Sequence, residues 1–278
     1  MNCKRHLRPP IWRHVFWAGL AAIALVPVAA SGQEIRIGGT GNALGTMQLL
    51  GGAFAQANPA IKVSVMPSMG TAGAIKAVPK GAIALGLSSR PLSEEESRLG
   101  LTAVEYAQSP TVFAVVKSSK IAAVTTKQLV DIYAGKLAAW PDGSPVRPIL
   151  RQPGDDNTRQ IKALSADMEA AVSSADKRAG LVFAVTDQEA AEKIETIPGG
   201  LGVSTLALML SEKRNLRALA LDGVELVLKN LANGRYPLVK KFYMILPASP
   251  SADVQAFVKF VKSPAGAEIL KQNGQIAR

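Results

Sequence analysis

Cysteine and histidine are nearly absent from this sequence of 278 residues. Cys3 is the only cysteine, and His6 and His14 are the only histidines, so the chain beyond residue 14 contains neither residue type. A thiol or imidazole nucleophile, a Ser-His-Asp triad and a Cys/His zinc site are therefore excluded there. Aromatic residues make up only 5% of the chain, whereas 48% of the residues are apolar. This composition excludes disordered and disulfide-stapled proteins and indicates a globular chain.

The N-terminus has the pattern of a secretory signal peptide. Four basic residues precede an apolar stretch at residues 15–26, and small residues follow it. About a dozen apolar residues are too few to span a bilayer of roughly 30 Å comfortably, so an uncleaved anchor is the less favoured alternative. We predict a signal peptide at residues 1–32, cleaved after Ala30 or Gly32, and export to the periplasm. Its removal lowers Lys+Arg from 32 to 28 against 21 acidic residues, a net charge of +7.

After the signal segment, short β-rich runs alternate with amphipathic stretches. Ile35 and Ile37 indicate a strand, and the apolar residues between 44 and 57 recur at spacings of three and four, which is typical of a helix. This alternation predicts an α/β fold with mostly parallel strands. Capping boxes predict three helix starts, at Ser93 with Glu96, Thr125 with Gln128, and Thr186 with Glu189.

Four polar loops follow predicted strands and precede predicted helices, at residues 38–46, 67–73, 88–91 and 151–159. In open α/β sheets, ligands bind beyond the carboxyl ends of the strands, where helices begin. Each loop by itself fits a polar turn that caps the next helix. Together, because all four carry hydroxyl or amide side chains and two carry arginine, they indicate a small anionic ligand.

Seven segments carry a resemblance to a known family: GGTGNALGTMQLL, PSMGTAGAIKAV, ALGLSSRPLSEEE, TTKQLVDIYAGKLAAWPDGSPVRPILR, IPGGLGVSTLALM, NGRYPLVKKFYMILP and AFVKFVKSPAGAEIL. The sequence resembles the phosphate-binding proteins of ABC importers, a branch of the type II periplasmic binding proteins. Residues 127–151 and 233–247 are the most specific. The resemblance implies an α/β fold of two lobes with a ligand cleft between them, lobe 1 being residues 33–106 plus 242–278 and lobe 2 residues 107–241.

The resemblance also implies a function. An exported solute-binding protein would capture inorganic phosphate or a related oxyanion by lobe closure and pass it to an ABC permease at the inner membrane. We expect a monomer that is not an enzyme, with no catalytic residue, cofactor or metal. Carried over by position, the ligand-binding residues are Thr40, Gly41, Asn42, Ser68, Gly70, Thr71, Ser88, Ser89, Arg90, Arg151, Asp156, Asn157 and Thr158.

Two departures from the family pattern concern the charge of the site. Ala84 stands where the family commonly has an aspartate, and Asp155-Asp156 precedes Asn157-Thr158 where the family has Ser-Gly-Thr. Like charges about 4 Å apart cost on the order of 4 kcal/mol at an effective dielectric constant of 20. Either Asp156 or Asn157 caps a helix that begins near Thr158, or the ligand offers a donor or cation to Asp156, or binding is lost.

Two other functions are consistent with the sequence. The chain could be an exported two-lobed sensor or adaptor that binds an organic acid or a protein partner. It could also be a secreted hydrolase that uses Asp155 or Asp156 with a metal. We expect no nucleic-acid partner, because the basic residues are scattered and no recognition motif is present. Lys240 and Lys241 could meet an acidic permease, but the favoured interpretation is that they are solvated residues, and Trp140 is interpreted as a packing anchor.

Overall fold

The computed structural model describes Met1 and residues 33–278, so nearly all of the predicted signal peptide lies outside the described residues. Strands and helices alternate along the chain as expected. The strands are β1 (Gln33–Gly39), β2 (Ile61–Val65), β3 (Leu85–Ser88), β4 (Thr102–Val116), β5 (Ala123–Val124), β6 (Arg147–Arg151), β7 (Val182–Ala184), β8 (Gly200–Thr205), β9 (Leu216–Ala218), β10 (Ala220–Leu221), β11 (Val239–Leu246) and β12 (Ile276–Ala277).

Eleven helices lie within the described residues. They are α1 (Gly41–Ala57), α2 (Gly70–Ala77), α3 (Glu94–Ser97), α4 (Thr126–Tyr133), α5 (Asp156–Lys162), α6 (Ala166–Ala175), α7 (Asp187–Thr196), α8 (Leu206–Ser211), α9 (Leu228–Ala232), α10 (Ala252–Val261) and α11 (Pro264–Gln272).

The large sheet has the strand order β2-β1-β3-β11-β4-β8-β6-β7, with β9 and β12 paired to β4 off this path. The prediction of mostly parallel strands is wrong for its centre, because β4 and β11 pair antiparallel with every neighbour. The reason is the length of β4. Its first part, up to Pro110, pairs with β11, and its last part, from Thr111, pairs with β8 and β9. One strand therefore serves both halves of the molecule.

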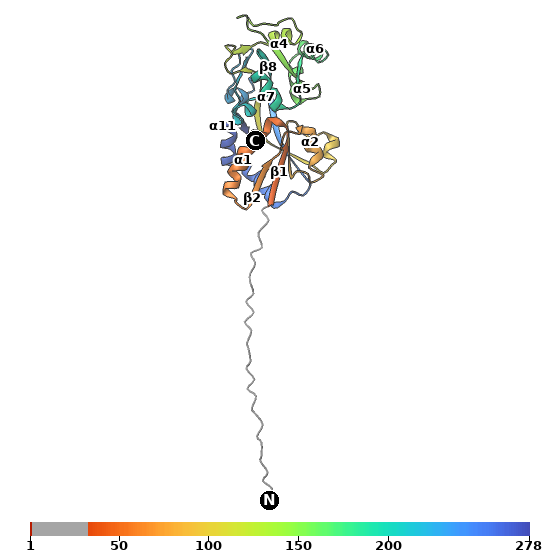
Figure 1. Cartoon of the computed structure of the whole chain (residues 1–278), viewed down its shortest axis with the longest axis vertical. Coiled ribbons are helices and arrows are strands. Elements are labelled where there is room, and N and C mark those ends of the chain that lie inside the picture. Colours follow the sequence, from red (N-terminus) through yellow and green to blue (C-terminus); the bar gives the residue numbers. More distant parts are fainter. Residues whose placement is uncertain (2–32) are drawn as a thin grey trace. The chain divides into compact units, whose positions relative to one another are not determined.

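The buried apolar residues divide into two core regions. The first core region draws on residues 35–107 and 242–270, with Ala207 from α8. The second core region draws on residues 112–238, and Trp140 packs within it as expected. Figure 1 shows the two regions stacked along the long axis, with α1, α2, β1 and β2 in one and α4, α5, α6 and β8 in the other. The chain passes between them on β4 and before β11.

Helix capping follows the sequence closely. Complete capping boxes form at Ser93 with α3 and at Thr125 with α4. At α7 the box is incomplete. Thr186 accepts a hydrogen bond from the Glu189 amide, but the Glu189 carboxylate accepts from the Val185 amide instead of from Thr186. The starts of α3 and α4 are thus capped as the local sequence predicts, whereas α1 and α2 begin without a side-chain cap.

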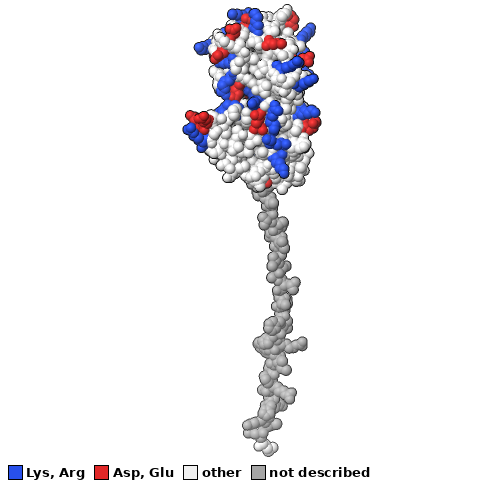
Figure 2. All heavy atoms as spheres, turned by 180° about the vertical axis from the view of Figure 1, so that it is seen from behind, with Lys and Arg blue, Asp and Glu red and all other residues white. Residues whose placement is uncertain are grey.

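One face of the protein carries side chains of both charges. In the face seen in Figure 2, Lys and Arg side chains are spread widely, with Asp and Glu side chains among them. Among these residues, no helix has both the length and the apolar character that crossing a membrane requires.

Candidate functional site

A cavity of about 510 Å³ lies where the four predicted loops meet, joined by residues 185–187 before and at the start of α7. Loops from the first core region and loops from the second line it together. This convergence confirms that the four loops share one place, as the sequence predicted. The predicted ligand-binding residues that line the cavity are Thr40, Asn42, Ser68, Gly70, Thr71, Ser89, Arg90, Arg151, Asp156 and Asn157.

Three predicted residues do not line this cavity. Gly41 is covered, because a Cβ there would lie 2.9 Å from an Asp187 carboxylate oxygen. The Ser88 hydroxyl is directed at its own loop and donates to the Arg90 carbonyl at 2.5 Å. Thr158 is buried and borders a small interior cavity next to Tyr133. These three residues therefore support the conformation of the loops and do not face the cavity.

Arg151 comes from the last position of β6 and is only 7% exposed. Its Nη2 lies 2.7 Å from Asp155 Oδ2 and 3.3 Å from Asp187 Oδ1, and its Nη1 donates to the Ala184 carbonyl at 3.4 Å. Burial by itself lowers the pKa of Arg151, but the carboxylates of Asp187 and Asp155 outweigh it and raise that pKa. The guanidinium is a permanently charged group in the wall of the cavity.

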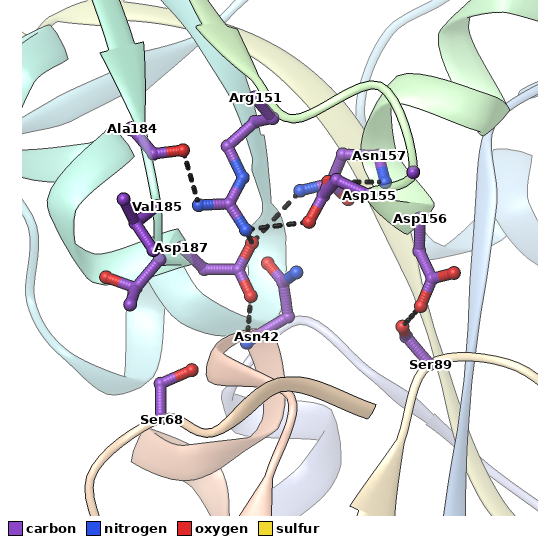
Figure 3. Close-up of polar contacts among 12 residues, drawn as sticks. Asn42, Ser68, Ser89, Arg151, Asp155, Asp156, Asn157, Ala184, Val185 and Asp187 are labelled. Carbon is purple, nitrogen blue, oxygen red and sulfur yellow. Dashed lines mark hydrogen bonds and ion pairs between the residues drawn. The ribbon is translucent and has the colours of Figure 1, made fainter. Parts of the chain in front are cut away.

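Asp187, the first residue of α7, lies at the centre of the polar network (Figure 3). Its Oδ2 accepts from the backbone N–H of Asn42 at 3.1 Å, and its Oδ1 accepts from Asn157 Nδ2 at 3.1 Å. Burial raises the pKa of Asp187, and Arg151 opposes that rise. The sequence did not indicate this residue, because an acid in the first turn after a Thr cap is an ordinary feature of helices.

Asp156 is directed across the cavity toward Ser89, as Figure 3 shows. Its Oδ2 accepts from the hydroxyls of Ser89 and of Thr71, the latter at 3.3 Å, and its Oδ1 pairs with Arg159. The prediction that Asp156 or Asn157 caps the helix is wrong. The cap of α5 is Asp155, whose Oδ1 accepts from the Asn157 amide at 2.9 Å, and the helix begins at Asp156.

Arg90 lines the cavity, but both ends of its guanidinium are held by Glu96. Nη1 and Nη2 each lie 2.7 Å from a different Glu96 oxygen. The hydrogen bond from Arg90 lowers the pKa of Glu96 to about 2. Glu96 also completes the capping box at Ser93, so the pair fixes the loop after β3 to α3. Arg90 therefore acts as a structural cation at the rim.

Replacing Glu96 by glutamine is expected to destabilise the protein by about 1 kcal/mol at pH 7, the scale of a partly exposed ion pair. Because the pKa of Glu96 is depressed from 4.5 to about 2, its contribution is complete above 4.5 and is lost as the pH falls through about 2. Urea unfolding of wild type and variant at several pH values should show the difference shrinking over that interval. Glu94→Gln, at an exposed position of the same helix, should change little at any pH. A pH-independent difference would contradict the prediction.

Lys240 on β11 is a residue that the sequence analysis misinterpreted. It is only 3% exposed, so the solvated role is wrong for Lys240, whereas Lys241 is exposed. Burial lowers the pKa of Lys240, and the carboxylates of Asp156, Asp187 and Asp155 oppose that shift. Lys240 borders a second cavity of about 280 Å³ that shares Asp156 and Ser89 with the first. A buried lysine thus lies close to the carboxylates of the site.

The paired carboxylates leave no arrangement suited to a metal within residues 33–278. No group of three or more His, Cys, Asp or Glu side chains is placed there to hold a metal ion. The carboxylates bind arginine, hydroxyl and amide donors of the chain itself. The polar side chains around the cavity therefore interact through hydrogen bonds and ion pairs.

Comparison with known proteins identifies the family. Residues 26–265 match the family model described as the PBP superfamily domain, so the chain belongs to the PBP superfamily. A stretch of 112 residues is 29% identical to the phosphate-binding protein PstS 2 of Streptococcus agalactiae. That match covers 40% of this chain and 38% of the relative. The chain therefore matches less than two thirds of the length of this relative.

Solved structures of other proteins show the same fold. A candidate phosphate ABC transporter substrate-binding protein from Clostridium perfringens, with bound phosphate, has a TM-score of 0.74 at 20% identity and covers 88% of this chain and 100% of its own. An ABC-type phosphate transport receptor from Vibrio cholerae has a TM-score of 0.60 at 18% identity, covering 88% and 99%. The predicted two-lobed α/β periplasmic-binding-protein fold is confirmed.

Proposed function

We propose that this chain is an exported solute-binding protein that captures phosphate or a similar small oxyanion for an ABC importer by lobe closure. One observation carries the proposal. The buried guanidinium of Arg151, the backbone N–H of Asn42 at the start of α1 and the amide of Asn157 all converge on one cavity between the two core regions. Guanidinium groups and helix N-termini are the donors that bind tetrahedral anions best.

The organisation of the chain supports the same proposal. We assign lobe 1 to residues 33–106 plus 242–278 and lobe 2 to residues 107–241, since the two core regions divide near these boundaries. Export to the periplasm, action as a monomer without enzymatic activity, and delivery to a permease in the inner membrane complete the proposal. The names of the similar proteins, which include a phosphate-binding protein and a phosphate transport receptor, favour this role.

Calorimetric titration of the purified exported protein tests the proposal directly. Phosphate, arsenate, sulfate and molybdate are titrated in turn, with chloride at matched ionic strength as the control for non-specific salt effects. We expect a saturable heat with at least one tetrahedral oxyanion and none with chloride. No heat from any of the four oxyanions at millimolar concentration would rule out oxyanion capture.

An organic acid is the second candidate ligand, and the size of the cavity favours it. At about 30 Å³ per water in the liquid, a cavity of about 510 Å³ has room for on the order of 15 waters, far more than one phosphate displaces. Solved structures of this fold include one bound to L-phospholactate, at 10% identity with a TM-score of 0.57. Mass spectrometry of small molecules released on denaturing the purified protein distinguishes the candidates. Recovery of phosphate alone would exclude the organic acid.

A further inference from the structure

The donors that could bind an anion in this cavity, which we call the anion seat, are already occupied by a carboxylate of the chain itself. Asp187 accepts hydrogen bonds from the backbone N–H of Asn42 and from Asn157 Nδ2, and its Oδ1 lies 3.3 Å from Arg151 Nη2 (Figure 3). A helix N-terminus, an amide and a guanidinium are also the partners on which the proposed function relies. The internal carboxylate and an external oxyanion therefore compete for one set of donors.

The contacts of Asp187 join the two core regions. Asn42 belongs to α1 of the first region, whereas Asp187 and Arg151 belong to the second. Asp156 makes a similar bridge, because it lies in α5 of the second region and accepts from Ser89 and Thr71 of the first. The Asn42 amide and the hydroxyls of Ser89 and Thr71, all in the first region, are thus occupied by carboxylates from the second.

The Asp187 carboxylate does not provide hydrogen bonds for all the polar atoms of Arg151 and Asn157. Within residues 33–278, Arg151 Nε and Asn157 Oδ1 are buried without a hydrogen-bond partner, although both residues are more than nine-tenths buried. Buried polar groups are nearly always paired, so two unpaired atoms beside Asp187 show that its carboxylate leaves this cluster incompletely satisfied. A tetrahedral oxyanion has more oxygens than a carboxylate and can accept from more donors at once.

We propose that Asp187 is an internal ligand of the anion site, which an incoming oxyanion must displace, and that this competition determines which anions bind. The inference rests on the proposed function. An anion entering beside Asp187 would meet a like charge, and two like charges repel most strongly where water is excluded. A monovalent carboxylate that displaces Asp187 only replaces one carboxylate by another, so it gains little binding free energy. A multivalent tetrahedral oxyanion gains both charge and hydrogen bonds.

The molecule has room for the exchange. Asp187 itself lines the cavity of about 510 Å³, so its side chain can turn away from the donors without entering a packed core. It lies in the first turn of α7, directly after Val185, which is 67% exposed, and Thr186. The Thr186 cap holds the start of the helix while the Asp187 side chain moves.

Asp187→Asn is the first test, because it removes the charge and keeps the size of the side chain. We expect the dissociation constant of phosphate, measured by calorimetry, to fall roughly tenfold or more, the effect of removing one charge-assisted competitor. Asp131→Asn makes the same change of net charge at α4, outside the cavity, where Asp131 pairs with Lys127 at 2.8 Å. The control should bind phosphate as wild type does, so a gain caused by net charge alone is recognised.

Asp187→Ala with added formate is the second test and does not require tight phosphate binding. The truncation leaves an empty space about the size of a small carboxylate ion, next to the same donors. Formate at millimolar concentration should raise the thermal unfolding midpoint of Asp187→Ala and leave that of wild type unchanged. An equal response of both proteins would contradict the inference, because the formate would then bind elsewhere.

The outcomes separate the inference from the function on which it rests. Phosphate binding by wild type with equal or weaker binding by Asp187→Asn overturns the inference and leaves the proposed function standing. Binding by Asp187→Asn alone supports the inference and overturns phosphate capture by the wild-type protein. Binding by neither protein overturns both.

Discussion

Replacing Arg151 by methionine is expected to lower the free energy of unfolding by about 3–5 kcal/mol, because removing one partner of a buried ion pair leaves the other charge uncompensated. Arg151 is 7% exposed and lies within 3.3 Å of two carboxylates, those of Asp155 and Asp187. Asp155 is partly exposed and can be hydrated in the variant. Asp187 is only 8% exposed and is hydrated less easily, so we expect it to account for most of the cost.

The double variant Arg151→Met/Asp187→Asn tests that explanation. Removal of the orphaned charge should recover a large part of the lost stability, and a double-mutant cycle from urea unfolding measures the coupling. Arg217→Met, at an exposed position of β9, is the matched control and should change stability by less than about 0.5 kcal/mol. Additive effects of the two substitutions would show that the pair is not coupled.

The same substitution has a second readout in binding. Arg151→Met should weaken oxyanion affinity by about 1.5–3 kcal/mol, the scale of a hydrogen bond to a charged group. Calorimetry on the double variant, compared with Asp187→Asn alone, separates this loss from misfolding and from the gain expected of Asp187→Asn, since the double variant is expected to be more stable than Arg151→Met. An unchanged dissociation constant would place Arg151 outside the ligand site.

Replacing Gly39 by alanine is expected to destabilise the protein by about 3 kcal/mol, among the larger effects of a single substitution. Gly39 ends β1 with φ +153°, and a Cβ there would lie 2.0 Å from the Leu87 carbonyl oxygen. That oxygen is backbone of the neighbouring strand β3 and accepts from the Thr40 amide at 3.0 Å. The clash would separate β1 from β3 at the point where the chain enters the site.

Gly52→Ala is the matched control, because Gly52 is an exposed residue of α1 and a Cβ there meets nothing within 4 Å. It should stabilise the protein by about 0.5–1 kcal/mol, since alanine has a higher helix propensity than glycine. Urea unfolding of both variants measures the two changes. A Gly39→Ala variant as stable as wild type would show that β1 and β3 can separate without cost.

Local features of the site followed from the sequence. The strand-to-helix loops, the cap at Ser93 and the position of Arg151 at the end of a strand depend on residues only a few positions apart. The departure at residues 155–156 was also visible, although the capping residue was off by one or two positions. Local signals of this kind are strong because each cap satisfies its own helix start.

Contacts between distant residues did not follow from the sequence. Asp187 is separated from Asn42 by 145 positions, and its environment is decided by packing of α7 against α1 and β6. In the sequence, Lys240 and Lys241 look like a pair of solvated lysines. In the structure, Lys240 on β11 is buried next to the site. The antiparallel pairing of β4 and β11 depends on a return of the chain after more than a hundred residues.

By itself, the sequence determined the fold class, the family resemblance, the absence of thiol and imidazole chemistry beyond residue 14, and the four loops that form the cavity. Only the tertiary structure decided the state of the charges in the cavity. It placed Asp187 on the donors of the anion seat, tied Arg90 to Glu96 and buried Lys240. The physical reason is that a loop's conformation depends on its own residues, whereas the partner of a charge depends on which distant segment packs against it.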